Sequence, residues 1–305
     1  MQFLQKIPVR KTVILALVGL LIIFVIFKTS VNIGGFSRVI RDISWFYFYL
    51  AFATIIPIII VNTAKWYLIV RAAGFNISFW KIFKTIITSS SLGVLPGRLG
   101  DFARSYPIRH TVPVSQAIGT ILLEKIIDIS VLLAFSGMGL FFLGYKTIAI
   151  FLWILATVAI PSLRIAGHIS HKILPQNDLT DKLHSALSVL NKVMGKKLLF
   201  LTAIASSVTN GIISMFHVYL LFKAVGTIVP FFAVLAFQPL SMFAGLLPIT
   251  LAGVGTRDST MIYLFHNFAT PEQSLAVGIL YGIQAYWIIA LLGLPLLYYF
   301  FKENA

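Results

Sequence analysis

Two short segments combine glycine, arginine and aspartate in a spacing suited to binding an anion. Glycine lets a backbone approach a ligand closely, and the free N–H groups at the start of a helix attract negative charge. The planar fork of arginine matches the oxygens of a phosphate. We interpret both segments as parts of one site for an anionic headgroup. The first supplies Gly97, Arg98, Gly100, Asp101 and Arg104, and the second supplies Gly253, Gly255, Arg257 and Asp258.

The same residues also have an interpretation without a ligand. Arg98 and Arg104 would lie at the cytoplasmic surface of a membrane and set the topology, because basic residues gather on that side. Asp101 would then pair with one of these arginines. The sequence alone leaves both interpretations open.

Glu124 and Asp128 stand inside a long apolar segment, four residues apart, and therefore share a helix face. A charge at the centre of a membrane span costs roughly 2.5–3.5 kcal/mol on insertion scales. We therefore expect both carboxylates to face the protein interior and to contact a cation. Their functional interpretation is proton or headgroup coupling, and the alternative is a structural ion-pair network. The candidate cations are Lys65, Arg98, Arg104 and Arg257.

Other polar residues give weaker signals. Asn210 and His217 are seven residues apart in one apolar segment and can share a helix face, where such residues are more often packing groups than ligands. His168 and His171 also share a face, but no third ligand lies nearby, and the chain has no cysteine. We therefore predict no metal site and no cofactor.

The composition restricts the class of protein that can carry these motifs. Of the 305 residues, 59% are hydrophobic and 11% are charged, against about 45–50% and about 25% in soluble domains. This excludes an ordinary soluble enzyme and a disordered chain. The net charge is +15, but the basic residues lie mostly between apolar runs. That pattern indicates membrane topology and contact with anionic lipids, with no nucleic-acid partner.

The apolar runs are long enough to cross a bilayer, which takes about 18 or more residues. We predict an all-α, polytopic integral membrane protein of the cell membrane, with residues 1–305 as one transmembrane domain. Both termini are expected in the cytoplasm, because this places more Lys and Arg there. Pro57 predicts a kink in the second span. The predicted full spans, about six in number, are 13–27, 45–70, 114–143, 147–163, 198–222 and 274–301.

Two further apolar segments, 83–109 and 229–268, are broken by glycine and proline. Both contain Gly-x-x-Pro, at Gly93 and at Gly245, followed by glycines, arginine and aspartate. We interpret them as re-entrant broken-helix pairs that enter from opposite sides and are related as an inverted repeat, with a site near the midplane. Pro96 and Pro248 should then face one shared cavity. Eight full spans, and a chance similarity between the breaks, remain alternatives.

The longest polar stretch is 164–197. We predict that it is a cytoplasmic linker between the two halves and that it carries an interfacial amphipathic helix. Its apolar positions at helical spacing are Leu183, Leu187, Leu190 and Met194.

These motifs together resemble the flippase-like transmembrane region of the lysylphosphatidylglycerol synthase family. The matching residues are Pro96 to Arg104, then Glu124-Lys125-x-x-Asp128, then Pro248 through Asp258. The chain departs from the family pattern at Asp101 and Asp258, where glutamate is expected, and at Ala252, where a second glycine is usual.

The resemblance implies translocation of a lipid or lipid-linked headgroup by a stand-alone member without the aminoacyltransferase domain. The implied partner is an anionic phospholipid or a polyprenyl-phosphate-linked lipid, and a homo-oligomer is left open. The sequence has no Walker motif for an ATPase. One alternative is an integral-membrane transferase acting on a lipid phosphate, which would need clustered acids that the sequence lacks. Another is a non-transporting scaffold in a lipid-synthesis complex.

Overall fold

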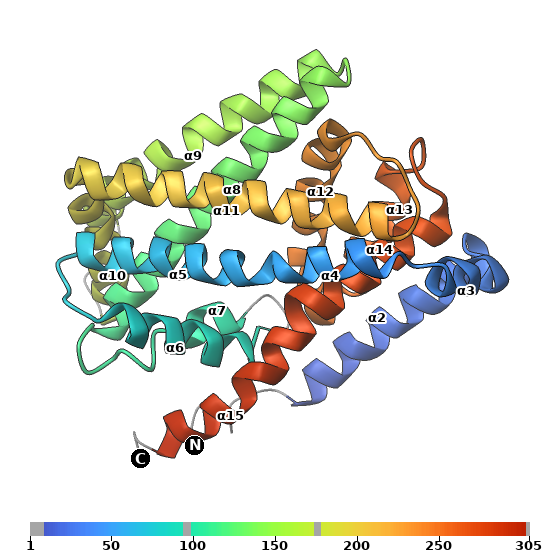
Figure 1. The fold of residues 1–305 in the computed structure, drawn as a ribbon. Coiled ribbons are helices and arrows are strands. Elements are labelled where there is room, and N and C mark those ends of the chain that lie inside the picture. The colour runs from blue at the N-terminus through green and yellow to red at the C-terminus, as the bar shows by residue number, and fades with distance from the viewer. Residues whose placement is uncertain (1–8, 94–98, 174–177, 303–305) are drawn as a thin grey trace.

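The computed structural model describes residues 9–93, 99–173 and 178–302, and every regular element within these ranges is helical (Figure 1). The predicted all-α fold class is therefore confirmed. The N-terminal half contains α2 (Val9–Thr29), α3 (Ile33–Arg41), α4 (Trp45–Ala53), α5 (Ile55–Ala72), α6 (Phe79–Ser90), α7 (Leu99–Ala103) and α8 (Val114–Phe142). The remainder contains α9 (Lys146–Ile173), α10 (Asp178–Gly195), α11 (Lys197–Ala224), α12 (Phe231–Leu246), η2 (Leu251–Gly253), α13 (Thr256–Leu264), α14 (Pro271–Gly282), η3 (Ile283–Trp287) and α15 (Ile288–Lys302).

Several helices are long and apolar enough to cross a membrane. Three described stretches meet that description alone, and α2 with α3, bent by 102°, could form a fourth. The three are Trp45–Ala72, Lys197–Ala224 and Pro271–Leu296. Helix α8 has 29 residues and carries Glu124, Lys125 and Asp128. The architecture is that of a membrane protein, whereas six full spans and cytoplasmic termini stay predictions.

The second predicted span is broken at Thr54, where α4 ends and α5 begins. Pro57 lies in the first turn of α5, and its ring cannot fit against the carbonyl four residues earlier. This explains why the break occurs one turn before the proline. Helices α4 and α5 lie along α11 (Figure 1).

Both glycine-rich segments interrupt their helices as the sequence predicts. After α6 the chain turns, and a Cβ on Gly100 of α7 would lie 2.3 Å from the backbone nitrogen of Gly93. After α12, a Cβ on Gly253 would lie 2.8 Å from the Cα of Gly245. In each segment a later glycine thus packs on the glycine of the Gly-x-x-Pro motif. Re-entry from opposite sides and an inverted repeat stay predictions.

The second break contains backbone of the left-handed region. Ala252 has φ 52° and Gly253 has φ 74°. Glycine adopts such angles without steric cost, whereas alanine does so rarely. This is a physical reason for a second glycine at position 252 in the family pattern, and this chain carries alanine there instead.

The stretch 164–197 is largely helical, and α10 packs against α8. Its buried positions include Ala186, Val189, Leu190 and Val193. The predicted apolar stripe shares only Leu190 with this set, and Leu183 is 40% exposed. The buried face of α10 is therefore rotated from the predicted one. The helices approach closely at Ala186, where a Cβ on Gly119 of α8 would lie 2.2 Å from the Ala186 carbonyl oxygen, so a small side chain is needed at the contact.

Candidate functional site

Four buried or half-buried charges from three segments form one cluster. Lys65 Nζ of α5 lies 2.6 Å from Asp128 Oδ1 and 3.5 Å from Glu124 Oε1. Arg104, just after α7, donates from Nη2 to Glu124 Oε2 at 2.6 Å. Ser207 of α11 donates a hydrogen bond to Asp128. Both carboxylates of α8 therefore face the interior and contact cations, as we expected.

The cluster is neutral, since two cations face two carboxylates, and aromatic packing shields one end of it. The guanidinium of Arg104 lies 4.6 Å from the ring centroid of Trp66, at a distance typical of cation–π contacts. The indole N–H of Trp66 donates to Thr120 at 3.1 Å. Lys65 and Glu124 are fully buried. Removing one charge would leave an opposite charge in the cluster with weaker compensation or with none.

A second ion pair joins α8 to the first broken segment. Lys125 Nζ lies 2.8 Å from Asp101 Oδ2, and both side chains are 29% exposed. The interpretation without a ligand had Asp101 pair with Arg98 or Arg104, and the pairing with Arg104 is wrong, whereas Arg98 lies outside the described residues. The carboxylate of Glu124 holds the Arg104 guanidinium, so Asp101 pairs with the cation that α8 presents on an adjacent face.

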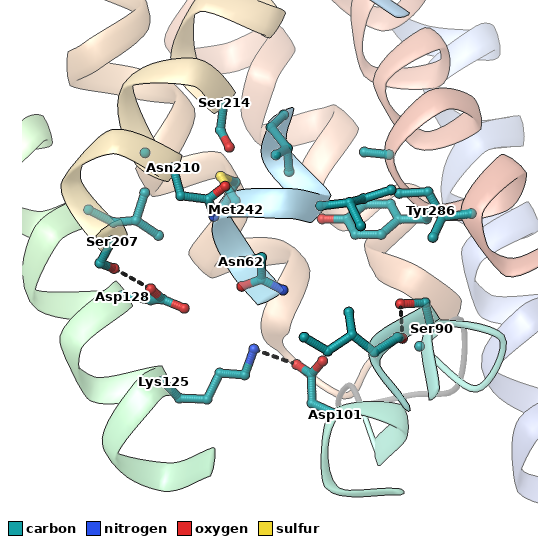
Figure 2. A pocket seen from close by; sticks show the side chains of 18 of the residues that line it. Asn62, Ser90, Asp101, Lys125, Asp128, Ser207, Asn210, Ser214, Met242 and Tyr286 are labelled. Atoms are coloured by element: carbon teal, nitrogen blue, oxygen red, sulfur yellow. Dashed lines mark hydrogen bonds and ion pairs between the residues drawn. The ribbon is translucent and has the colours of Figure 1, made fainter. Parts of the chain in front are cut away.

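A cavity of about 400 Å³ lies beside these charges (Figure 2), within the size range of ligand pockets, roughly 300–1,000 Å³. Lys125 reaches toward Asp101 at one end, and Asn210 and Ser214 line it farther along α11 (Figure 2). Most of the remaining wall is aliphatic or aromatic. From the first broken segment Gly93, Asp101 and Phe102 line the cavity, and from the second Met242, Phe243 and Leu246 do so.

The expectation that both broken segments border one cavity is therefore confirmed for these lining residues. We expected Pro96 and Pro248 to face this cavity. Pro96 lies outside the described residues. Pro248 is exposed and does not line the cavity. The second segment reaches the cavity through α12, before the break, and not through the glycine-rich turn after it.

Arg257 and Asp258 are buried and bind each other. Arg257 Nη2 donates to Asp258 Oδ1 at 2.7 Å and to the carbonyl oxygen of Gly278 at 2.8 Å. Asp258 Oδ2 accepts the backbone N–H of Gly255 at 2.9 Å and so caps α13. The candidate pairing of Arg257 with Glu124 or Asp128 is therefore wrong, because the neighbouring carboxylate already occupies the guanidinium.

Arg257 nevertheless borders the cavity wall from behind. Its guanidinium carbon lies 5.2 Å from the ring centroid of Tyr281 and 5.8 Å from that of Tyr286, and both tyrosines line the cavity. The π-helical turn Ile283–Trp287 places Tyr286 there. The tyrosines thus separate Arg257 from the space in which a ligand could lie.

The predicted site residues therefore divide into several groups. Asp101 and Asp128 line the cavity. Arg104 and Glu124 lie behind it in the charge cluster, and Gly100 packs on the preceding turn. The second-segment residues that support the turn and do not line the cavity are Gly253, Gly255, Arg257 and Asp258. Gly97 and Arg98 lie outside the described residues.

The sequence interpretation missed several residues at the cavity. Lys125 pairs with Asp101 of the first broken segment, on a face of α8 adjacent to that of Glu124. Its position inside an apolar run is the sequence feature that could have indicated a buried role. Asn62, Ser207 and Ser214 are isolated polar residues on apolar helices, which periodicity alone does not assign to a partner. In the part of the chain that the structure describes, no group of three or more His, Asp or Glu side chains is placed to hold a metal ion.

Comparison with known proteins gives a consistent result. Residues 13–293 match the model of the lysylphosphatidylglycerol synthase TM region. A UPF0104 membrane protein of Methanocaldococcus jannaschii is 24% identical over 95% of this chain and 95% of its own length. A UPF0104 membrane protein of Methanothermobacter thermautotrophicus is 27% identical over 39% of this chain and 35% of its own. Since the family match covers most of the sequence, the chain belongs to the lysylphosphatidylglycerol synthase TM-region family of membrane proteins.

Proposed function

We propose that the protein moves the polar headgroup of a membrane lipid, or of a lipid-linked precursor, from one leaflet to the other. The observation that carries this proposal is the cavity between the two broken segments, which combines an apolar wall with charged and polar groups inside a bundle of apolar helices. A headgroup needs polar partners during its passage, because burying a polar group without a hydrogen bond is costly.

The charged end of the cavity is suited to a phosphate. Lys125 is half-buried and lines the cavity, and within the described residues its ion-pair partner is the half-buried carboxylate of Asp101. Its ammonium can turn from Asp101 to a phosphate oxygen without moving through the apolar wall. An anionic phospholipid or a polyprenyl-phosphate-linked lipid would offer that oxygen, and Arg98 remains a predicted second cation.

Such transport fits the proposed topology, in which about six full spans and two re-entrant pairs form an inverted repeat in the cell membrane. The described helices and the family membership support a membrane role related to lipids. No ATPase motif is present, so we propose that an ion gradient, the membrane potential or the lipid gradient drives the movement and that the protein is not an enzyme.

The test is lipid translocation in sealed vesicles that contain the purified protein. Lipids labelled on an acyl chain, one with an anionic and one with a zwitterionic headgroup, are followed by quenching from the outside. We expect the wild type to expose inner-leaflet anionic lipid faster than protein-free vesicles do.

Lys125→Gln should slow this exposure about tenfold, the lower bound for losing one charge-assisted contact. Lys192→Gln is the matched control, because Lys192 is exposed on α10 and removes the same charge away from the cavity. Equal rates for wild-type and protein-free vesicles would refute translocation of these lipids. Equal slowing by both substitutions would remove Lys125 from the mechanism.

A further inference from the structure

The end of the cavity away from the ion pairs is lined by uncharged polar groups of one helix. Asn210, Ser214 and His217 follow at spacings of four and three residues, so they lie along one face of α11. All three line the cavity. Ser207, which binds Asp128, begins the same face one turn earlier. We call Asn210, Ser214 and His217 the polar track.

The hydrogen bonds of His217 determine what its ring offers to the cavity. Nδ1 lies 2.9 Å from the carbonyl oxygen of Ala51. Because a carbonyl oxygen only accepts hydrogen bonds, Nδ1 carries the proton. Thr54 Oγ1 also lies 2.9 Å from Nδ1 and donates its own proton to the same carbonyl. In the neutral ring Nε2 is therefore an acceptor.

Two acceptors of the polar track have no hydrogen-bond partner among the residues that the structure describes. His217 is 1% exposed, and its Nε2 accepts no hydrogen bond from any described residue. Asn210 Oδ1 is likewise buried and without a partner in this part of the chain. A buried polar atom without a partner is destabilising and calls for an explanation such as a bound molecule. The two residues are about two helical turns, roughly 10 Å, apart along α11, so a ligand that carries several hydrogen-bond donors along its length would satisfy both acceptors.

The charges around the cavity decide which kind of donor fits. Both carboxylates that line it are already paired with a lysine, Asp101 at 2.8 Å and Asp128 at 2.6 Å. A phosphate that draws Lys125 away would release Asp101, but Asp101 lies at the opposite end of the cavity from Asn210 and Ser214 (Figure 2). An ammonium beside the polar track would thus lack a free carboxylate among the described lining residues, and a cation buried without one is strongly disfavoured. Hydroxyl groups need no counter-charge.

We propose that the polar track binds the hydroxyl groups of an uncharged polyol or sugar headgroup, while the phosphate that links it to the lipid lies toward Lys125. This inference rests on the proposed function for its consequence in transport, but binding can be measured separately. The polar track would contact the headgroup and not the acyl chains. The affinity for a lipid should therefore depend on its headgroup hydroxyls and not on the length of its acyl chains.

The test compares two lipids of equal charge that differ only in these hydroxyls. Phosphatidylglycerol carries a glycerol headgroup, and phosphatidylmethanol carries the same phosphate without free hydroxyls. Phosphatidylethanolamine supplies the ammonium. Retention of each lipid by the purified protein is measured in micelles by native mass spectrometry, and translocation of each is measured in vesicles.

The substitutions separate the acceptor from the fold. His217→Asn keeps an N–H donor near the position of Nδ1, which can still bond the Ala51 carbonyl, but it has no atom at the position of Nε2. Asn210→Leu removes Oδ1 at similar volume. Thr209→Val is the matched control, since Thr209 is exposed on the same helix and bonds its own backbone.

We expect the wild type to retain phosphatidylglycerol over phosphatidylmethanol, and each track variant to reduce that preference roughly two- to tenfold, as loss of one neutral hydrogen bond predicts. Phosphatidylmethanol retention and Thr209→Val should not change. Preference for phosphatidylethanolamine, or a hydroxyl preference that survives both track variants, would overturn the proposal. Hydroxyl-selective retention without translocation would uphold the subsite and refute the transport function.

Discussion

The pair formed by Arg104 and Glu124 can be removed as a unit, and the result separates structure from transport. In the single variant Arg104→Met, Glu124 keeps only the more distant Lys65, at 3.5 Å. In the single variant Glu124→Leu, Arg104 loses the carboxylate with which it pairs among the described residues. Breaking one side of a buried ion pair costs about 3–5 kcal/mol, so additive effects would destabilise the double variant by about 6–10 kcal/mol.

We expect the double variant to be far more stable than that sum. It retains the neutral pair of Lys65 with Asp128 at 2.6 Å and leaves no uncompensated charge in the cluster. Replacing a whole buried pair with apolar residues is often neutral or stabilising. The remaining loss is the stacking of Arg104 on Trp66, about 2 kcal/mol when desolvated. The double variant should therefore lie within about 2 kcal/mol of the wild type.

The measurement is the free energy of unfolding in mixed micelles titrated with a denaturing detergent, for the wild type, both single variants and the double variant. The matched control makes the same kinds of change at exposed positions of α3 and its cap, Arg38→Met and Asp42→Leu, where effects within about 0.5 kcal/mol are expected. A double variant destabilised by the full sum of the singles would show that the two charges do not compensate each other. A stable double variant that no longer translocates lipid would assign the pair to transport.

Two further predictions concern close packing and the second broken segment. Gly119→Ala should destabilise the fold by about 1–3 kcal/mol, because the new methyl group would lie 2.2 Å from a carbonyl oxygen of α10. The control is Gly195→Ala, whose methyl group would have no atom within 4 Å. In the same unfolding titration this control should be neutral or slightly stabilising. Asp258→Asn should cost about 3–5 kcal/mol, since it leaves a fully buried arginine without its carboxylate; the exposed control Asp42→Asn should change little, and equal effects of the two would contradict this account.

The positions of the main helices follow from the sequence because hydrophobic runs and helix breakers act locally. The predicted segment 114–143 is α8, Val114–Phe142, and the predicted segment 198–222 is α11, Lys197–Ala224. The two breaks were also readable, because glycine and proline disfavour a continuous helix whatever surrounds them. The order of these same local motifs predicts the family resemblance, and the family match over residues 13–293 confirms it.

The partners of the charged residues did not follow in the same way. The sequence placed Glu124 and Asp128 inside the protein, but the choice among Lys65, Arg104 and Arg257 depends on how three helices rotate against one another. Lys65 and Asp128 are 63 residues apart in the sequence, and a local sequence pattern cannot predict a contact between residues so far apart. Arg257 instead binds the adjacent carboxylate, a choice set by the tight turn before α13.

The polar track was underestimated for a related reason. Asn210 and His217 on an apolar helix usually pack against polar groups of a neighbouring helix, and His217 does so through Nδ1. Only the structure shows that His217 Nε2 and the Asn210 oxygen have no partner among the described residues and belong to side chains that line a cavity. Local spacing predicts a shared face, whereas the satisfaction of each atom is a tertiary property.

Asp128 is the point at which the buried cluster and the cavity meet. Its carboxylate binds Lys65 and Ser207, yet the side chain is 26% exposed and lines the cavity, whereas Glu124 beside it is fully buried. Under the proposed function, a headgroup that enters the cavity would meet a neutral cluster and no isolated charge that would hold it there. The proposed phosphate would draw Lys125 from Asp101, whose side chain is 29% exposed and is therefore partly accessible to water. We propose that exchangeable pairing at the cavity surface, with strong pairing behind it, allows a headgroup both to bind and to leave.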